Sequence, residues 1–303
     1  MHFNIQILTA TLALMSVSAW PQTTKTESRT DEVRLPDTEA RHVTSKITGR
    51  IYDLWISLPA NYGNGTQRFP VLYVLDGAVV FGMVRDILFA LQGRTAGEPV
   101  PLPPMIIVAI TCPERPGRDV RSEGFKRCAA VRQLDLTPTV SGEKAPGKEV
   151  SSGGAQKFLG TMREEIFPMI EANYRTTKDR GLVGSSLGGL FATYVLFNSP
   201  DTFSRYLIGS PSLWWDNGIM FKQEARFASD HRELPARVFL SVGADEGGDM
   251  IPAMLKMADA LKKYGRLELK SHIFENETHF SVIPAALSRG MRFLYRPRSP
   301  QAQ

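Results

Sequence analysis

Cysteine and histidine are scarce in this 303-residue chain, which has two cysteines and five histidines. Cys112 and Cys128 do not form a Cys-x-x-Cys pair, and no two histidines stand at the spacing of a metal-binding pair. Because zinc sites are built from such closely spaced ligands, we expect no metal site. The chain also lacks the glycine-rich signature of a nucleotide-binding loop. We therefore expect no cofactor.

Internal repeats and basic runs interleaved with aromatic residues are also absent. Such runs are typical of nucleic-acid-binding proteins, so we expect no nucleic-acid partner. The net charge is +5. That value is compatible with an anionic substrate or an anionic envelope surface. An ordinary protein surface is the simpler explanation.

The first apolar run of the chain, Ile5–Ala19, is too short to span a bilayer comfortably. It ends in Val-Ser-Ala, which fits a signal-peptidase site, although no Lys or Arg precedes the run. We expect residues 1–19 to be a signal peptide that is removed on export to the periplasm or the medium, which leaves no membrane span. Residues 20–40 are mostly polar and are predicted to be disordered.

Apolar runs typical of strands alternate with helical patterns from residue 70 onward, which predicts an α/β fold with a mostly parallel sheet flanked by helices. The length suits one domain, over 41–296, followed by a short tail at 297–303. Upstream, residues 42–47 and 50–58 are expected to form a hairpin that adds antiparallel edge strands. Residues 112–152 are long for a connection and are predicted to be a cap-like insertion over the functional site.

The sequence Gly-Ser-Ser-Leu-Gly at residues 184–188 stands between a short strand signal and an apolar helical run. This is the context of a nucleophile elbow, in which the residues two before and two after the nucleophile must be small. Only Ser186 meets that condition, because Ser185 would have Val183 and Leu187 at those positions. The alternative is an ordinary glycine turn.

Two later strand ends carry the groups that would activate Ser186. A buried strand, 237–242, is followed by Gly-Ala-Asp-Glu, and the strand 267–274 is followed by His279. Imidazole can take the serine proton, and a carboxylate can orient the imidazole. The spacing after Gly243 favours Glu246 as the acid, whereas residue type favours Asp245. Asp249 is a third candidate.

The other four histidines fit this role less well. His2 lies in the leader, His42 in the N-terminal hairpin, His231 in a charged stretch and His272 inside a strand. His279 alone follows the last strand, where the order Ser, acid, His requires it.

The negative oxygen that forms during acyl transfer needs backbone N–H donors, each worth about 3 kcal/mol. The amide of Leu187, directly after the nucleophile, is the first candidate. The second is the amide of Ala78, in the loop after the strand 69–75. For that loop the alternative is a plain glycine turn.

Three residues are candidates for substrate binding. Arg132 offers a fork of donors to an anionic or polyoxygenated substrate, or else forms a salt bridge with Asp135. Trp214 and Trp215 follow a strand on the expected edge of the sheet, where they would form an aromatic wall or pack into the core. Adjacent side chains point in different directions, so we expect one of the two tryptophans to pack inward.

Cys112 and Cys128 are expected to pair if the protein is exported, with a contribution of about 3 kcal/mol from closing a short loop. Two free buried thiols are the alternative.

Several segments together resemble the putative-esterase family of α/β-hydrolases, which includes siderophore esterases, feruloyl and acetyl esterases, and mycolyltransferases. The resemblance covers about residues 45 to 295. The segments that carry it are Phe-Pro-Val-Leu-Tyr-Val-Leu-Asp-Gly at 69–77, Arg-Gln-Leu-Asp-Leu-Thr-Pro at 132–138, Gly-Gly-Ala-Gln-Lys-Phe-Leu at 153–159, the elbow at Ser186, and Thr-His-Phe at 278–280. The segment at 135–138 is similar to the siderophore-esterase branch in particular. The resemblance implies the α/β-hydrolase fold and a serine esterase, and the open identity of the acid leaves a Ser–His dyad as an alternative to a triad.

The sequence therefore predicts an exported serine carboxylic-ester hydrolase that acts on a small-molecule ester, with siderophore and aryl esters as candidate substrates. An acyltransferase would use the same residues, with an alcohol in place of water. A non-catalytic binding protein on the same fold is a third possibility, against which Ser186, His279 and the acidic loop argue.

Overall fold

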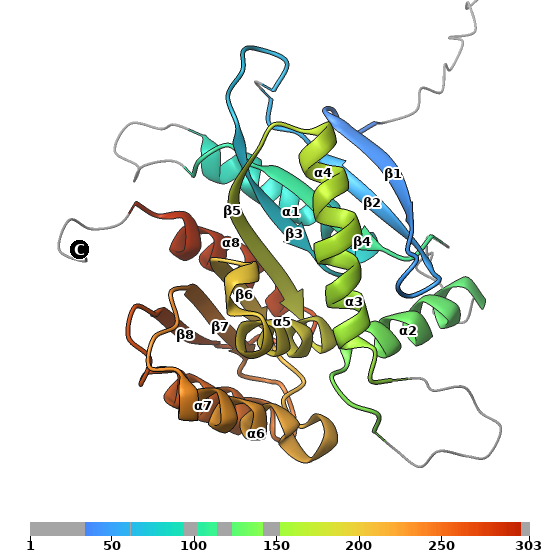
Figure 1. The fold of residues 1–303 in the computed structure, drawn as a ribbon. Coiled ribbons are helices and arrows are strands. Elements are labelled where there is room, and N and C mark those ends of the chain that lie inside the picture. Colours follow the sequence, from blue (N-terminus) through green and yellow to red (C-terminus); the bar gives the residue numbers. More distant parts are fainter. Residues whose placement is uncertain (1–33, 61, 94–101, 114–122, 142–151, 298–303) are drawn as a thin grey trace, which may run out of the picture. The chain divides into compact units, whose positions relative to one another are not determined.

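The structure is a computed structural model that describes residues 34–60, 62–93, 102–113, 123–141 and 152–297 (Figure 1). The expected signal peptide, most of the segment 20–40, the stretches 114–122 and 142–151 of the insertion and residues 298–303 of the tail lie outside the described residues. The chain divides into two units, Met1–Leu35 and Pro36–Gln303. The second unit contains every element described below.

An eight-stranded sheet forms the centre of this unit, with the order β1-β2-β4-β3-β5-β6-β7-β8. Strands β1, β2 and β4 pair antiparallel, and every other pair is parallel. The strands are β1 Thr38–Thr44, β2 Ile51–Ser57, β3 Phe69–Val74, β4 Ile106–Thr111, β5 Thr176–Ser185, β6 Arg205–Gly209, β7 Arg237–Gly243 and β8 Glu268–Phe274. The predicted hairpin is therefore present as β1 and β2, and β1 begins at Thr38, before the expected domain start at residue 41.

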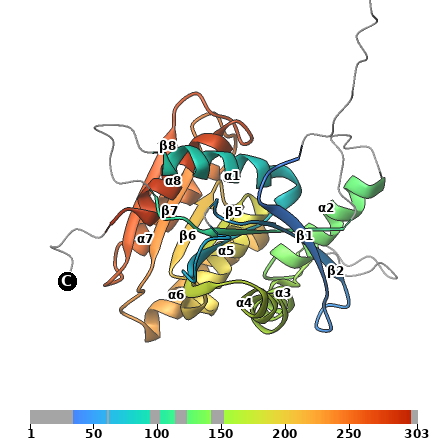
Figure 2. The ribbon, with the colours of Figure 1, turned by 90° about the horizontal axis from the view of Figure 1, so that it is seen from above.

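Helices cover both faces of the sheet (Figure 2). On one face α1 packs against α8, and the helices from α3 to α7 pack on the other. The helices are α1 Gly77–Gln92, α2 Glu123–Leu136, α3 Ala155–Thr161, the π-helical turn η1 Met162–Ile166, α4 Phe167–Asn173, α5 Leu187–Asn198, the 3₁₀ turn η2 Pro200–Thr202, α6 Trp215–Asp230, α7 Met250–Leu261 and α8 Val282–Tyr295.

Strand β3 shows why the central strands are apolar throughout. Phe69, Val71 and Tyr73 point into the core under the α3–α7 layer, whereas Leu72 and Val74 point into the core under α1 and α8. Successive side chains of a strand alternate between the two faces, so a strand that is covered on both faces needs apolar residues at every position.

The predicted insertion at 112–152 contains a helix in its described part. Helix α2 packs against α3 and α5, and Cys128 on α2 forms a disulfide with Cys112, directly after β4. The two cysteines therefore pair. Thr137 ties the end of α2 to the start of α3, because its hydroxyl accepts a hydrogen bond from the Gly153 amide, 2.7 Å. The insertion is thus held by the disulfide at Cys128, within α2, and by Thr137, directly after the helix.

Within the described ranges, no helix combines the length and the apolar character needed to cross a bilayer.

Candidate active site

Ser186 lies on the tight turn between β5 and α5. Its backbone has φ 60° and ψ −119°, a strained conformation for a residue with a side chain. Two hydrogen bonds hold the turn, from the Ser186 amide to the Gly209 carbonyl, 3.0 Å, and from the Leu190 amide to the Ser186 carbonyl, 2.9 Å. Such strain persists only where the surrounding structure imposes it, and it is frequent at functional sites.

The glycines around Ser186 are needed to different degrees. A Cβ added at Gly184 would collide with the backbone carbonyl of Gly188. At Gly189 it would come within 2.8 Å of the Gly209 carbonyl oxygen on β6, which is also too close. At Gly188 the nearest atom, Asp76 Oδ2, would be 3.4 Å away, an ordinary contact. Gly184 and Gly189 are therefore the sterically critical positions.

Glu246 and His279 meet at the ends of neighbouring strands β7 and β8. The Nδ1 atom of His279 lies 2.6 Å from Glu246 Oε2. The other two acidic candidates, Asp245 and Asp249, are exposed, whereas Glu246 is buried. Gly243 permits this approach, because a Cβ there would collide with the Glu277 carbonyl in the loop that carries His279.

The second carboxylate oxygen of Glu246 is also bound. Oε1 accepts a hydrogen bond from the Ser210 hydroxyl, 2.5 Å, and one from the Gly243 amide, 2.8 Å. Burial alone would raise the pKa of Glu246, but the hydrogen bonds from His279, Ser210 and Gly243 outweigh it and lower the pKa below its usual value. The structure thus favours an ionised carboxylate behind the imidazole.

Ser186 and His279 line the same cavity, but no hydrogen bond joins them among the described residues. The Ser186 hydroxyl instead lies 3.4 Å from the hydroxyl of Ser212. Catalytic hydrogen bonds in ligand-free enzymes are often long and tighten when substrate binds.

A second histidine–carboxylate contact joins His42 on β1 to Asp53 on β2, 2.6 Å apart. Neither residue lines the cavity. His279 is therefore the histidine that the fold brings into the cavity with Ser186.

The amide of Leu187 is the first of α5, and the amide of Ala78 is the second of α1. Neither donates a backbone hydrogen bond within the part of the chain that the structure describes. The first amides of a helix have no acceptor inside the helix, and they carry the positive end of its dipole. Ala78 lines the cavity and Leu187 directly follows Ser186, so both amides lie close to the place where a negative oxygen would form.

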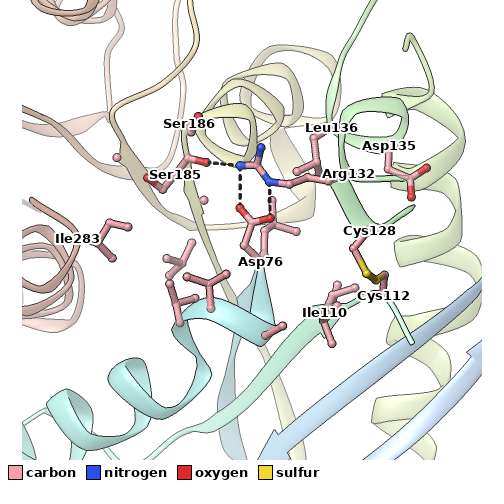
Figure 3. A pocket seen from close by; sticks show the side chains of 18 of the residues that line it. Asp76, Ile110, Cys112, Cys128, Arg132, Asp135, Leu136, Ser185, Ser186 and Ile283 are labelled. Carbon is pink, nitrogen blue, oxygen red and sulfur yellow. Dashed lines mark hydrogen bonds and ion pairs between the residues drawn. A yellow bond between two sulfur atoms is a disulfide. The ribbon is translucent and has the colours of Figure 1, made fainter. Parts of the chain in front are cut away.

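A cavity of about 390 Å³ opens beside Ser186 and is largely apolar (Figure 3). Its apolar wall comes from β-strand ends and from α1, α2, α3 and α8, and the disulfide Cys112–Cys128 borders it. The apolar lining includes Val79, Ile110, Val131, Leu136, Phe158, Val183, Leu207, Phe280, Ile283 and Leu287. Within the described residues, no group of three His, Cys, Asp or Glu side chains is placed to hold a metal ion.

Arg132 lines this cavity, but its guanidinium already has a partner. Nε and one terminal nitrogen bind the two carboxylate oxygens of Asp76, at 2.6 and 3.0 Å. The alternative that Arg132 pairs with Asp135 is wrong, because Asp135 binds Arg50 and the hydroxyl of Tyr52 instead. The two acidic residues on this side of the cavity are therefore each paired with an arginine.

The two tryptophans separate as adjacent side chains must. Trp215 is buried in the core, and its Nε1 donates to the Thr139 carbonyl, 3.3 Å. Trp214 is 53% exposed. Neither tryptophan lines the cavity beside Ser186, so the structure does not bring them into an aromatic wall there.

Three residues that matter to the geometry were not among the sequence-based candidates: Asp76, Ser210 and Ser212. Ser210 directly follows β6, so its position at a strand end was a readable signal. Asp76 lies two residues after the end of β3 and two residues before the candidate Ala78. The partners of these side chains come from distant parts of the chain and carry no sequence signal.

Comparison with known proteins decides the family. The model of the family described as "Putative esterase" matches residues 136–275. The ferri-bacillibactin esterase BesA of Bacillus subtilis is 31% identical over 283 residues, covering 88% of this chain and 92% of that protein. The chain belongs to this esterase family.

This esterase also resembles a fungal enzyme and a solved structure. The siderophore triacetylfusarinine C esterase of Aspergillus fumigatus is 28% identical, covering 88% of this chain and 96% of that enzyme. The crystal structure of the BES protein from Bacillus cereus superimposes with a TM-score of 0.76 at 30% identity, covering 89% of this chain and 98% of that one. The fold is thus the α/β-hydrolase fold, and this esterase is a carboxylic-ester hydrolase.

Proposed function

We propose that this esterase cleaves its substrate through a Ser186–His279–Glu246 triad. The observation that carries the proposal is the 2.6 Å contact between Glu246 and His279, the histidine that lines the same cavity as the strained Ser186. A strained, half-buried serine, a buried carboxylate behind an imidazole and two helix-start amides form a set with one common use. That use is acyl transfer to serine.

In the proposed mechanism each proton transfer has a definite donor and acceptor. With Nδ1–H donated to Glu246, the neutral ring of His279 has its lone pair on Nε2, which takes the proton as Ser186 Oγ attacks the ester carbonyl. The amides of Leu187 and Ala78 stabilise the oxyanion. Nε2–H then protonates the departing alcohol. Water, activated in the same way, releases the acid from the acyl-enzyme.

The cavity lining limits the chemistry of the group that enters it. Asp76 is paired with Arg132, and Asp135 with Arg50, so the acidic lining residues carry no unpaired charge. An apolar wall of this kind favours an uncharged group, because burying an unpaired charge is costly.

We propose siderophore esters as the substrate class, because the Aspergillus fumigatus relative is named as a siderophore esterase and the Bacillus subtilis relative as a ferri-bacillibactin esterase. The test is hydrolysis by the purified protein of p-nitrophenyl esters with uncharged and carboxylate-ended acyl chains, beside iron-loaded siderophore esters. We expect turnover of the uncharged aryl esters and of at least one siderophore ester, with the released acid found by mass spectrometry. Turnover of aryl esters alone would contradict the siderophore assignment, and no turnover at all would contradict the triad.

We also propose that the enzyme is exported. The apolar run before residue 20 and its Val-Ser-Ala end support cleavage there, and the Cys112–Cys128 disulfide supports an oxidising compartment. Sequencing the N-terminus of the protein from the source cell should give Trp20. An intact Met1 on a protein found in the cytoplasm would contradict export.

A further inference from the structure

One guanidinium joins the two backbone segments that lead to the oxyanion amides (Figure 3). Arg132 binds both carboxylate oxygens of Asp76, and its terminal nitrogen also donates to the Ser185 carbonyl, 3.2 Å. Asp76 stands two residues before Ala78, and Ser185 stands two residues before Leu187. The same side chain is therefore fixed to both halves of the proposed oxyanion hole.

Asp76 is a restrained position. Its φ is 57°, in the left-handed region, where a residue with a side chain needs support. Its carbonyl accepts hydrogen bonds from the Val79 and Val80 amides, at 2.9 and 3.3 Å, and its carboxylate is bound by Arg132. Ala78 lies inside this turn, so the ion pair and the two backbone hydrogen bonds hold the residue that precedes its peptide segment.

Arg132 is itself anchored close to its guanidinium. Cys128 lies four residues earlier on α2, on the same face of the helix, and its disulfide to Cys112 ties that turn to the end of β4. A fixed helix and a planar fork of donors together provide a rigid link, which a flexible Lys side chain with a single charged nitrogen cannot reproduce.

We propose that Arg132 is a positioning residue, which clamps Asp76 and Ser185 so that the Ala78 and Leu187 amides point at the developing oxyanion. The proposal rests on the function proposed above. The ion pair with Arg132 also neutralises the Asp76 carboxylate, which would otherwise repel the negative oxygen near the start of α5. Arg132 would then stabilise the transition state through the two amides, without contacting the substrate itself.

The two roles of Arg132 make opposite kinetic predictions. A substrate contact would raise KM for a bulky ester and leave p-nitrophenyl acetate unaffected. Loss of positioning lowers kcat for both esters, because interactions made only in the transition state are lost. We expect Arg132→Lys to lower kcat by about 10- to 100-fold on both esters, with KM within about twofold, since loss of a complete oxyanion donor costs about 100- to 1,000-fold.

The chain contains a matched control at the opposite edge of the sheet, where the parallel strands begin. Arg205, the first residue of β6, binds both oxygens of Asp179 at 3.1 and 2.7 Å. The exposed fractions of its side chain and that of Asp179 are 22% and 32%, against 31% and 20% for Arg132 and Asp76. Arg205→Lys should lower the unfolding temperature to a similar degree and leave kcat unchanged.

The experiment measures kcat and KM for Arg132→Lys, Asp76→Asn, the double variant and Arg205→Lys, together with the Kd of an arylboronic acid that mimics the tetrahedral intermediate. If Arg132 and Asp76 act as one clamp, the kcat of the double variant should be only slightly lower than that of the less active single variant. The Kd of the boronic acid should rise by about the same factor as kcat falls. Parental kcat in Arg132→Lys, or a loss confined to KM of the bulky ester, would overturn the positioning role. Ser186→Ala separates the two proposals: if it retains turnover, the proposed function fails, and if it is inactive while Arg132→Lys is unimpaired, only the positioning role fails.

Discussion

His279 Nδ1 lies 2.6 Å from Glu246 Oε2, and the neighbouring Asp245 is exposed. The contact separates the two acidic candidates by burial as well as by distance, since the Glu246 side chain is 1% exposed. Three donors converge on its two oxygens, which holds the carboxylate in a single orientation.

Glu246→Gln should lower kcat by about 1,000- to 10,000-fold, because an amide can hold the imidazole in the wrong tautomer and cannot stabilise the imidazolium. Asp245→Asn is the matched control, and its kcat should stay within about threefold of the parent. Steady-state kinetics on p-nitrophenyl acetate measure both. A large loss in Asp245→Asn with a small one in Glu246→Gln would move the role to Asp245, and two small losses would indicate a Ser–His dyad.

Glu246 should also make stability depend on pH. Its pKa is lower in the folded protein than its usual value of 4.5, so its ionised form stabilises the fold above pH 4.5. That contribution is lost as the pH falls through the lower, folded-state pKa. The difference in unfolding free energy between the parent and Glu246→Gln, measured in urea, should therefore be present at about pH 6 and shrink at about pH 3. A difference that grows on acidification would contradict the assigned sign.

The glycines of the elbow should respond unequally to substitution by alanine. Gly184→Ala forces a Cβ into the Gly188 carbonyl, and Gly189→Ala forces one against the Gly209 carbonyl, so both should lower the unfolding temperature and the activity. Gly188→Ala meets only ordinary contacts and should cost much less. Thermal unfolding and fluorophosphonate labelling of the three variants test this order. Equal losses at all three positions would show that the motif is constrained by something other than these contacts.

The site residues that follow strands could be predicted from the sequence. Ser186, Glu246 and His279 each follow a strand of a parallel sheet, and the carboxyl ends of such strands meet at one edge. Chain order and spacing alone therefore predict that these side chains gather, although only the structure shows which acid faces the imidazole. The sheet was predictable because strands that alternate with helices along the chain form a mostly parallel sheet.

The ion-pair partners of these side chains could not be predicted from the sequence. Arg132 and Asp76 are 56 positions apart, on a helix inside the insertion and on a strand-end turn, and no local pattern links them. The sequence suggested Asp135, three residues from Arg132, but Asp135 binds Arg50, directly before β2, and Tyr52 on β2. Likewise, which of Trp214 and Trp215 packs inward depends on how the core is filled, and not on residue type.

The most direct test of the account is labelling of the purified protein by a fluorophosphonate, with the modified residue located by mass spectrometry. A nucleophile at the elbow, activated by His279, should give one adduct on Ser186, and Ser186→Ala should abolish both the adduct and ester hydrolysis. Ser185→Ala, the adjacent control, should still be labelled. An adduct on Ser185, or labelling and turnover that survive in Ser186→Ala, would contradict the central claim.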